Sequence, residues 1–175
     1  MRTIIWLDDH LESGREYLIE RYLDVIKKAD VVPIKAPTLK KFRETMQNYC
    51  ANPNTIAGFL IDVMLTHRKE FRTFVDLDLP GVQLNAETAG IRVVEFLRTT
   101  DTDFGIERPV WLKTFSSHPM CLLTSRPDPA ELLREAAEGS NQWKNGVETI
   151  YKDDSDSHDV LADWLRKLAD GKVAS

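Results

Sequence analysis

The sequence has few cysteines, no long apolar runs and fewer basic than acidic residues. Its two cysteines, Cys50 and Cys121, are far apart, and Cys121 lies within an apolar segment, which favours reduced thiols over a disulfide. No apolar run approaches the length of a membrane span, and no signal peptide precedes the first apolar segment. We therefore expect a cytoplasmic protein with no membrane partner. The net charge of -5 also argues against direct binding to nucleic acid.

Internal repeats and low-complexity tracts are absent as well. The chain has 175 residues, of which 42% are hydrophobic and 29% are charged, as in a soluble globular protein. This length suits one domain with a full core. We expect a single domain over residues 1–170, without a separate output domain.

Polar residues stand at the ends of the apolar segments. The first segment ends at Asp8 and Asp9, another ends at Asp62, a third ends at Thr124 and the last ends at Lys152. In open α/β sheets, ligand sites lie beyond the carboxyl ends of the parallel strands. These side chains are therefore expected at one edge of a sheet. Carboxylates crowded together repel one another, which points to a bound divalent cation.

Segments with helical spacing alternate with the apolar segments. Thr38 is a helix-opening residue, and Pro33 predicts that a short strand over 31–34 lies at a sheet edge. The expected helices contain Leu18–Ile26 behind a Ser13-x-x-Glu16 capping box, Leu39–Tyr49, Gly90–Leu97, a segment opened by Asp128-Pro129, and Val160–Leu168. Alternation of this kind predicts an α/β fold with a five-stranded parallel sheet in the order 2-1-3-4-5 and helices on both faces.

Two stretches exceed what this minimal fold needs. Residues 66–87 and 99–118 read as insertions that border the predicted site, because long unstructured loops are uncommon in compact domains. The first contains several apolar residues and is predicted to be a partner or homodimer surface, or a lid over the site.

The ordered set of strand-end residues resembles the receiver domains of two-component response regulators. The resemblance extends from Ile4 to Leu168, and the segments 62–65 and 120–125 are similar to the family's third- and fourth-strand signatures. It implies a CheY-like fold and a phosphoacceptor signalling protein in a phosphorelay, not an enzyme. A histidine kinase or phosphotransfer protein would be the phosphodonor, and the output would occur through contact with a downstream protein.

The resemblance also implies a role for each site residue. Asp62 would be the phosphoacceptor, and Mg2+ would be held by Asp9 and Asp62, by Asp8 through water and by the backbone carbonyl of Met64. Lys152 would pair with Asp62 and then with the phosphoryl group. The hydroxyl of Thr124 would donate a hydrogen bond to a phosphoryl oxygen. The four histidines are interpreted as surface or loop residues: His10, His67, His118 and His158.

The sequence departs from the family pattern at three positions. Asp153 follows Lys152 where the family has proline, Thr149 replaces the family's switch aromatic, and Thr66 stands where proline often follows the third strand. These departures leave open an alternative in which the chain is a degenerate receiver that acts as a constitutive protein-docking module.

A second alternative is a phosphatase similar to the haloacid dehalogenases. Asp76-Leu77-Asp78-Leu79 resembles the nucleophile motif of that family, and residues 122–127 resemble its hydroxyl motif. The residues before Asp76 are too charged for a buried strand, however, and this interpretation leaves the first 60 residues unexplained. Phosphatase activity lost in Asp76→Ala but not in Asp62→Ala would support it.

Overall fold

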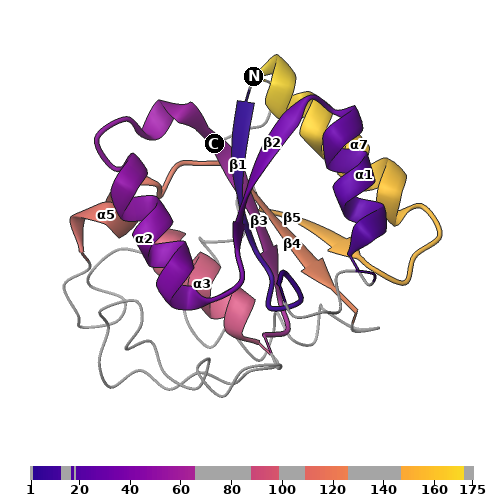
Figure 1. Cartoon of the computed structure of the whole chain (residues 1–175), viewed down its shortest axis with the longest axis horizontal. Helices are drawn as coiled ribbons and strands as arrows, with labels where there is room; N and C mark the ends of the chain where they lie inside the picture. The colour runs from indigo at the N-terminus through magenta and orange to yellow at the C-terminus, as the bar shows by residue number, and fades with distance from the viewer. Residues whose placement is uncertain are drawn as a thin grey trace.

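Five parallel strands form one sheet in the order β2-β1-β3-β4-β5, which confirms the predicted topology and matches a flavodoxin-like fold (Figure 1). The computed structural model describes residues 2–12, 17, 19–65, 88–98, 109–125 and 147–171. The strands are β1 (Arg2–Leu7), β2 (Val31–Ala36), β3 (Ile56–Asp62), β4 (Met120–Thr124) and β5 (Val147–Tyr151). Pro33 lies on the edge strand β2, as predicted, where a missing backbone donor is tolerated.

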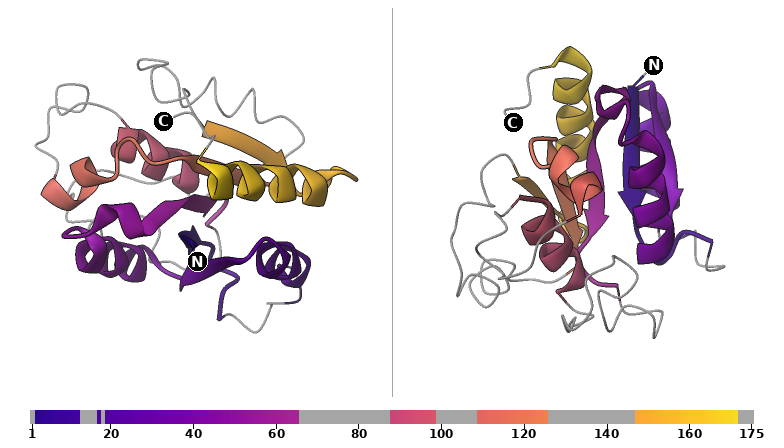
Figure 2. Two further views of the ribbon diagram at one scale, coloured as in Figure 1. Left: turned by 90° about the horizontal axis from the view of Figure 1, so that it is seen from above. Right: turned by 90° about the vertical axis from the view of Figure 1, so that its left-hand side faces the viewer.

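Helices cover both faces of this sheet (Figure 2). On one face lie α1 (Glu20–Lys28) and α7 (Ser157–Asp170), and on the other lie α2 (Leu39–Tyr49), α3 (Ala89–Arg98) and α5 (Val110–Thr114). Alternate residues of each strand serve the two layers, because side chains on a strand point to opposite faces. In β1, Ile4 and Trp6 belong to the α1/α7 core, while Ile5 and Leu7 belong to the other.

Local sequence signals account for several helix ends. The Thr38 hydroxyl oxygen accepts a hydrogen bond of 3.0 Å from the backbone N–H of Lys41 and so caps α2, as predicted. Gly171 caps the carboxyl end of α7 with a φ of 70°, which favours glycine. The helix α1 begins at Glu20, and the predicted capping box over residues 13–16 lies outside the described residues.

Of the two predicted insertions, only part of the second lies within the described residues. Residues 66–87 lie outside the described part of the chain, as does the helix predicted to begin at Asp128. The second insertion is described from residue 109. There α5 places Trp111 and Leu112 in the core that α2 and α3 share, and Phe115 directly after the helix joins them. That part of the predicted loop is therefore core structure. A short 3-10 helix, η2 (Pro53–Thr55), precedes β3.

Both cysteines are free thiols, as the sequence predicted. None of the helices in the described ranges has the length and apolarity required to cross a membrane.

Candidate functional site

The predicted site residues lie together at the carboxyl edge of the sheet. Asp8 and Asp9 directly follow β1, Asp62 is the last residue of β3, Thr124 ends β4 and Lys152 follows β5. All five residues are buried. Charged side chains are seldom buried unless they are paired, so these groups are expected to interact with one another or with a ligand. The parallel strands all end at this edge, so the fold alone concentrates three carboxylates and one ammonium group there.

An ion pair joins Lys152 to the carboxylates. Its Nζ donates a hydrogen bond of 2.8 Å to Asp62 Oδ1 and lies 3.8 Å from Asp8 Oδ2. Residues 62 and 152 come from strands that are not neighbours, since β4 lies between β3 and β5. The long lysine side chain therefore spans the end of β4 to reach Asp62.

Thr124 is placed beside this pair by strand register. Asp62 pairs with Leu123 across the β3–β4 ladder, and Thr124 is the next residue of β4. Its carbonyl accepts a hydrogen bond of 2.7 Å from the backbone N–H of Lys152. Met64 follows Asp62 by two residues and packs its side chain against the α2/α3/α5 core. The roles of the Thr124 hydroxyl and of the Met64 carbonyl remain predictions.

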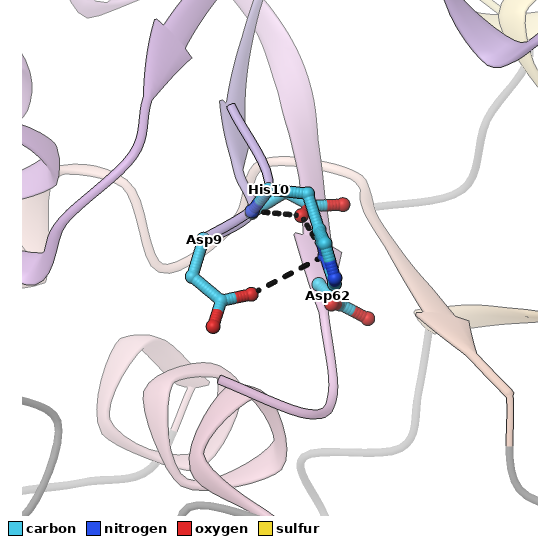
Figure 3. Close-up of side chains that lie close together, drawn as sticks. Asp9, His10 and Asp62 are labelled. Atoms are coloured by element: carbon cyan, nitrogen blue, oxygen red, sulfur yellow. Dashed lines mark hydrogen bonds and ion pairs between the residues drawn. The ribbon is translucent and has the colours of Figure 1, made fainter. Parts of the chain in front are cut away.

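His10 belongs to the site, although sequence reasoning did not include it. Its Nδ1 lies 3.1 Å from Asp8 Oδ1, and its backbone N–H donates to Asp8 Oδ1 at 2.9 Å. The same Nδ1 lies 3.4 Å from Asp9 Oδ1 (Figure 3). One potential ligand atom from each of Asp8, Asp9, His10 and Asp62 lies within 4.8 Å of the others. The sequence signal that could have identified His10 is its position directly after two acidic residues at the end of a strand.

The other described histidines lie away from this cluster. The ring of His118 packs against Phe59 and Phe115 at the edge of the core, and His158 stacks on Tyr22. His67 lies outside the described residues, as does Asp76 of the alternative phosphatase motif.

Gly90 is a second residue whose importance only the structure shows. An added Cβ at this position would lie 2.1 Å from the carbonyl oxygen of Asp62 and 2.8 Å from the Cα of Val63. The backbone N–H of Gly90 also donates to the carbonyl of Val63 at 3.1 Å. The first turn of α3 therefore rests directly on the backbone of the site, at a distance that only glycine permits.

Burial dominates the electrostatics of Asp62. Removal from water raises the pKa of Asp62 to about 7, and the attraction of Lys152 only partly opposes this, while Asp8 and Asp9 add to the rise. For Lys152, burial acts to lower the pKa, but Asp62 and Asp8 outweigh it and raise the pKa above the usual value. The ammonium group is therefore held in its charged form.

Asp8 and His10 stabilise each other's charged forms. Burial acts to raise the pKa of Asp8, but the hydrogen bond from His10 and the charge of Lys152 outweigh it, so the pKa of Asp8 is lowered. The same hydrogen bond raises the pKa of His10. With Asp9 and Asp62, the buried site holds more carboxylates than the single lysine can neutralise.

A divalent cation fits this donor set. Asp8 Oδ2 is buried and accepts no hydrogen bond from the described part of the chain. Buried carboxylate oxygens without donors are costly, and coordination to a cation removes that cost. Three carboxylates are ligands suited to hard cations such as Mg2+ or Mn2+, and the His10 imidazole also suits softer metals. The site can therefore bind a metal ion.

Comparison with protein-family models, with curated proteins and with solved structures finds no match for this chain.

Proposed function

We propose that this protein is a receiver-type phosphoacceptor, in which Asp62 takes a phosphoryl group in a Mg2+-dependent reaction. The observation that carries the proposal is the buried Asp62–Lys152 ion pair of 2.8 Å beside Asp8 and Asp9 at one sheet edge. A carboxylate held against a fixed ammonium and two further carboxylates has the parts needed for phosphoryl transfer.

The chemical step is a substitution at phosphorus. A carboxylate oxygen of Asp62 attacks the phosphoryl group of a donor, which is the phosphohistidine of a kinase or phosphotransfer protein, or a small acyl phosphate. A phosphorus–oxygen bond forms, the bond to the leaving group breaks, and its electron pair stays with the leaving group. An acyl phosphate donor releases a carboxylate, and a phosphohistidine donor releases an imidazole that takes a proton from water. The product is an acyl phosphate on Asp62.

Asp8, Asp9, Asp62 and the Met64 carbonyl would hold the metal ion, which when bound neutralises phosphoryl oxygens and lowers the pKa of Asp62. This explains the expected metal requirement. With a pKa of about 7, a large share of Asp62 is protonated near neutral pH and cannot attack. Lys152 balances part of the charge that the phosphoryl group adds.

The Thr124 hydroxyl would donate to a phosphoryl oxygen and draw the end of β4 toward the site. The output would then be a change in protein–protein contact. The partner could be a downstream protein or a second copy of this chain.

The test is phosphorylation by a small donor. Wild-type protein would be incubated with acetyl phosphate or phosphoramidate, with and without Mg2+, and analysed by intact mass. We expect a gain of one phosphoryl group only with Mg2+, and none in Asp62→Asn. Asp24→Asn, which removes an exposed carboxylate on α1, is the matched control and should still be modified. An equal mass gain in Asp62→Asn would refute the assignment.

The docking-module alternative has one structural feature in its favour. Thr149 on β5 is only half-buried and has no aromatic ring to change position between two states. If the wild-type protein binds Mg2+ but gains no phosphoryl group from any donor, the docking module becomes the better description.

A further inference from the structure

The backbone of Lys152 is held from two sides. Its N–H donates to the Thr124 carbonyl at 2.7 Å, so the end of β4 fixes one side of the residue. Its carbonyl accepts a hydrogen bond of 2.6 Å from Arg21 Nη2 and another of 3.3 Å from the Tyr22 hydroxyl. Arg21 and Tyr22 lie on α1, at the opposite end of the sequence from Lys152. The backbone of Lys152 is thus hydrogen-bonded to α1, a helix that contributes no other residue to the site.

The two α1 residues form a preassembled unit. The Arg21 guanidinium lies 4.9 Å from the centre of the Tyr22 ring, and its Nη2 also donates to the Tyr22 hydroxyl at 3.0 Å. Tyr22 is fully buried and stacks on His158 of α7, with ring centres 5.4 Å apart. Aromatic stacking and a cation over the ring restrict the motion of both donors. Arg21 is itself exposed, so the buried Tyr22 ring is what keeps both donors beside the Lys152 carbonyl.

A fixed backbone matters because the lysine side chain is long. Its four-carbon stem has several rotatable bonds, and holding Nζ at one point costs conformational entropy. Hydrogen bonds at both the N–H and the carbonyl of Lys152 fix its Cα, from which the side chain extends. The residue that follows, Asp153, is exposed.

We propose that Arg21 and Tyr22 are positioning residues that hold Lys152 against Asp62. Part of this inference, the effect on phosphoryl transfer, rests on the proposed function. The other part, the effect on the Lys152–Asp62 ion pair, does not depend on it.

The first experiment observes the ion pair directly by NMR. Protein containing lysine labelled with 13C gives a Cε signal for Lys152, which is assigned by its loss in Lys152→Met. We expect Arg21→Ala and Tyr22→Phe to shift or broaden this signal toward its position in Asp62→Asn. The matched control is Ile26→Val, a change to a fully buried residue of the same helix, which should leave the signal in place. An unmoved signal in both Arg21→Ala and Tyr22→Phe, or an equal shift in Ile26→Val, would overturn the inference.

The second experiment measures the rate of acyl phosphate formation. Loss of a hydrogen bond from a charged donor corresponds to about a tenfold effect, so Arg21→Ala should slow the reaction by about that factor while Mg2+ affinity is unchanged. Arg21→Lys should recover part of the rate. In a Lys152→Met background, Arg21→Ala should change the rate by less than about twofold, because residues that act through one another are not additive.

The same fold loss in both backgrounds would mean that Arg21 does not act through Lys152, and the inference would fail. If the wild-type protein forms no acyl phosphate, the proposed function fails instead. The NMR signal of Lys152 then still decides whether Arg21 and Tyr22 hold Lys152 against Asp62.

Discussion

Replacing Gly90 by alanine should damage the site more than it damages the fold. Gly90 lies in the first turn of α3 and has an ordinary helical backbone, so its need for glycine comes from space and not from φ. A Cβ there would lie 2.1 Å from the Asp62 carbonyl oxygen. Real contacts of this kind are not shorter than 3.0 Å, so the helix and the end of β3 must separate by at least 0.9 Å.

The size of both effects follows from this displacement. Overpacking costs about 1–3 kcal/mol, and better helix propensity of alanine returns less than about 1 kcal/mol near a helix start. The net loss of about 1–2 kcal/mol corresponds to a fall in Tm of roughly 2–8 °C for a domain of this size. The effect on the reaction is larger, because misplacing a reacting group by about 1 Å can reduce the rate on the order of a hundredfold.

The assay compares Gly90 with a control glycine, Gly58, that lies farther from the site. Gly58 lies on β3 four residues before Asp62, about 13 Å away along the strand, and its added Cβ would meet the Pro119 carbonyl oxygen at 2.8 Å. Gly58→Ala should therefore destabilise the protein with little change in the rate of acyl phosphate formation. Both variants would be measured by thermal unfolding, Mg2+ titration and phosphorylation rate. A Gly90→Ala protein that is phosphorylated as fast as Gly58→Ala would refute this reasoning.

Three further predictions concern charge. Lys152→Met leaves Asp62 buried without its cation, so urea unfolding without metal should show a loss of about 3–5 kcal/mol in the free energy of unfolding. Adding Asp62→Asn should recover most of this loss, and a loss below about 1 kcal/mol would contradict the prediction. His10→Ala should lower Zn2+ or Co2+ affinity by about tenfold or more in calorimetric titrations and leave Mg2+ affinity nearly unchanged, since Mg2+ prefers oxygen ligands; equal losses would exclude nitrogen ligation. Burial lowers the pKa of His118 below 6.5, so the unfolded state takes up its proton first and stability should fall as the pH drops from 6.5 toward the lower folded pKa. In His118→Gln this part of the pH dependence of unfolding should disappear, and an unchanged profile would show that another group is responsible.

The sequence by itself determined the architecture and the edge at which the site lies. Apolar segments alternating with helical spacing specify parallel strands covered on both faces, and Asp8, Asp62, Thr124 and Lys152 mark where those strands end. Pro33 indicated the edge strand, because a residue without a backbone donor is confined there. These features depend on local pattern, which a sequence displays directly.

Tertiary structure alone decided the distances around those strand ends. His10 joins the carboxylates because the turn after β1 directs its ring toward them, and Gly90 is required because α3 meets β3 at Asp62. Arg21 reaches the Lys152 carbonyl across 131 residues of sequence. Contacts between such distant residues depend on how the layers pack, and no local spacing encodes that packing.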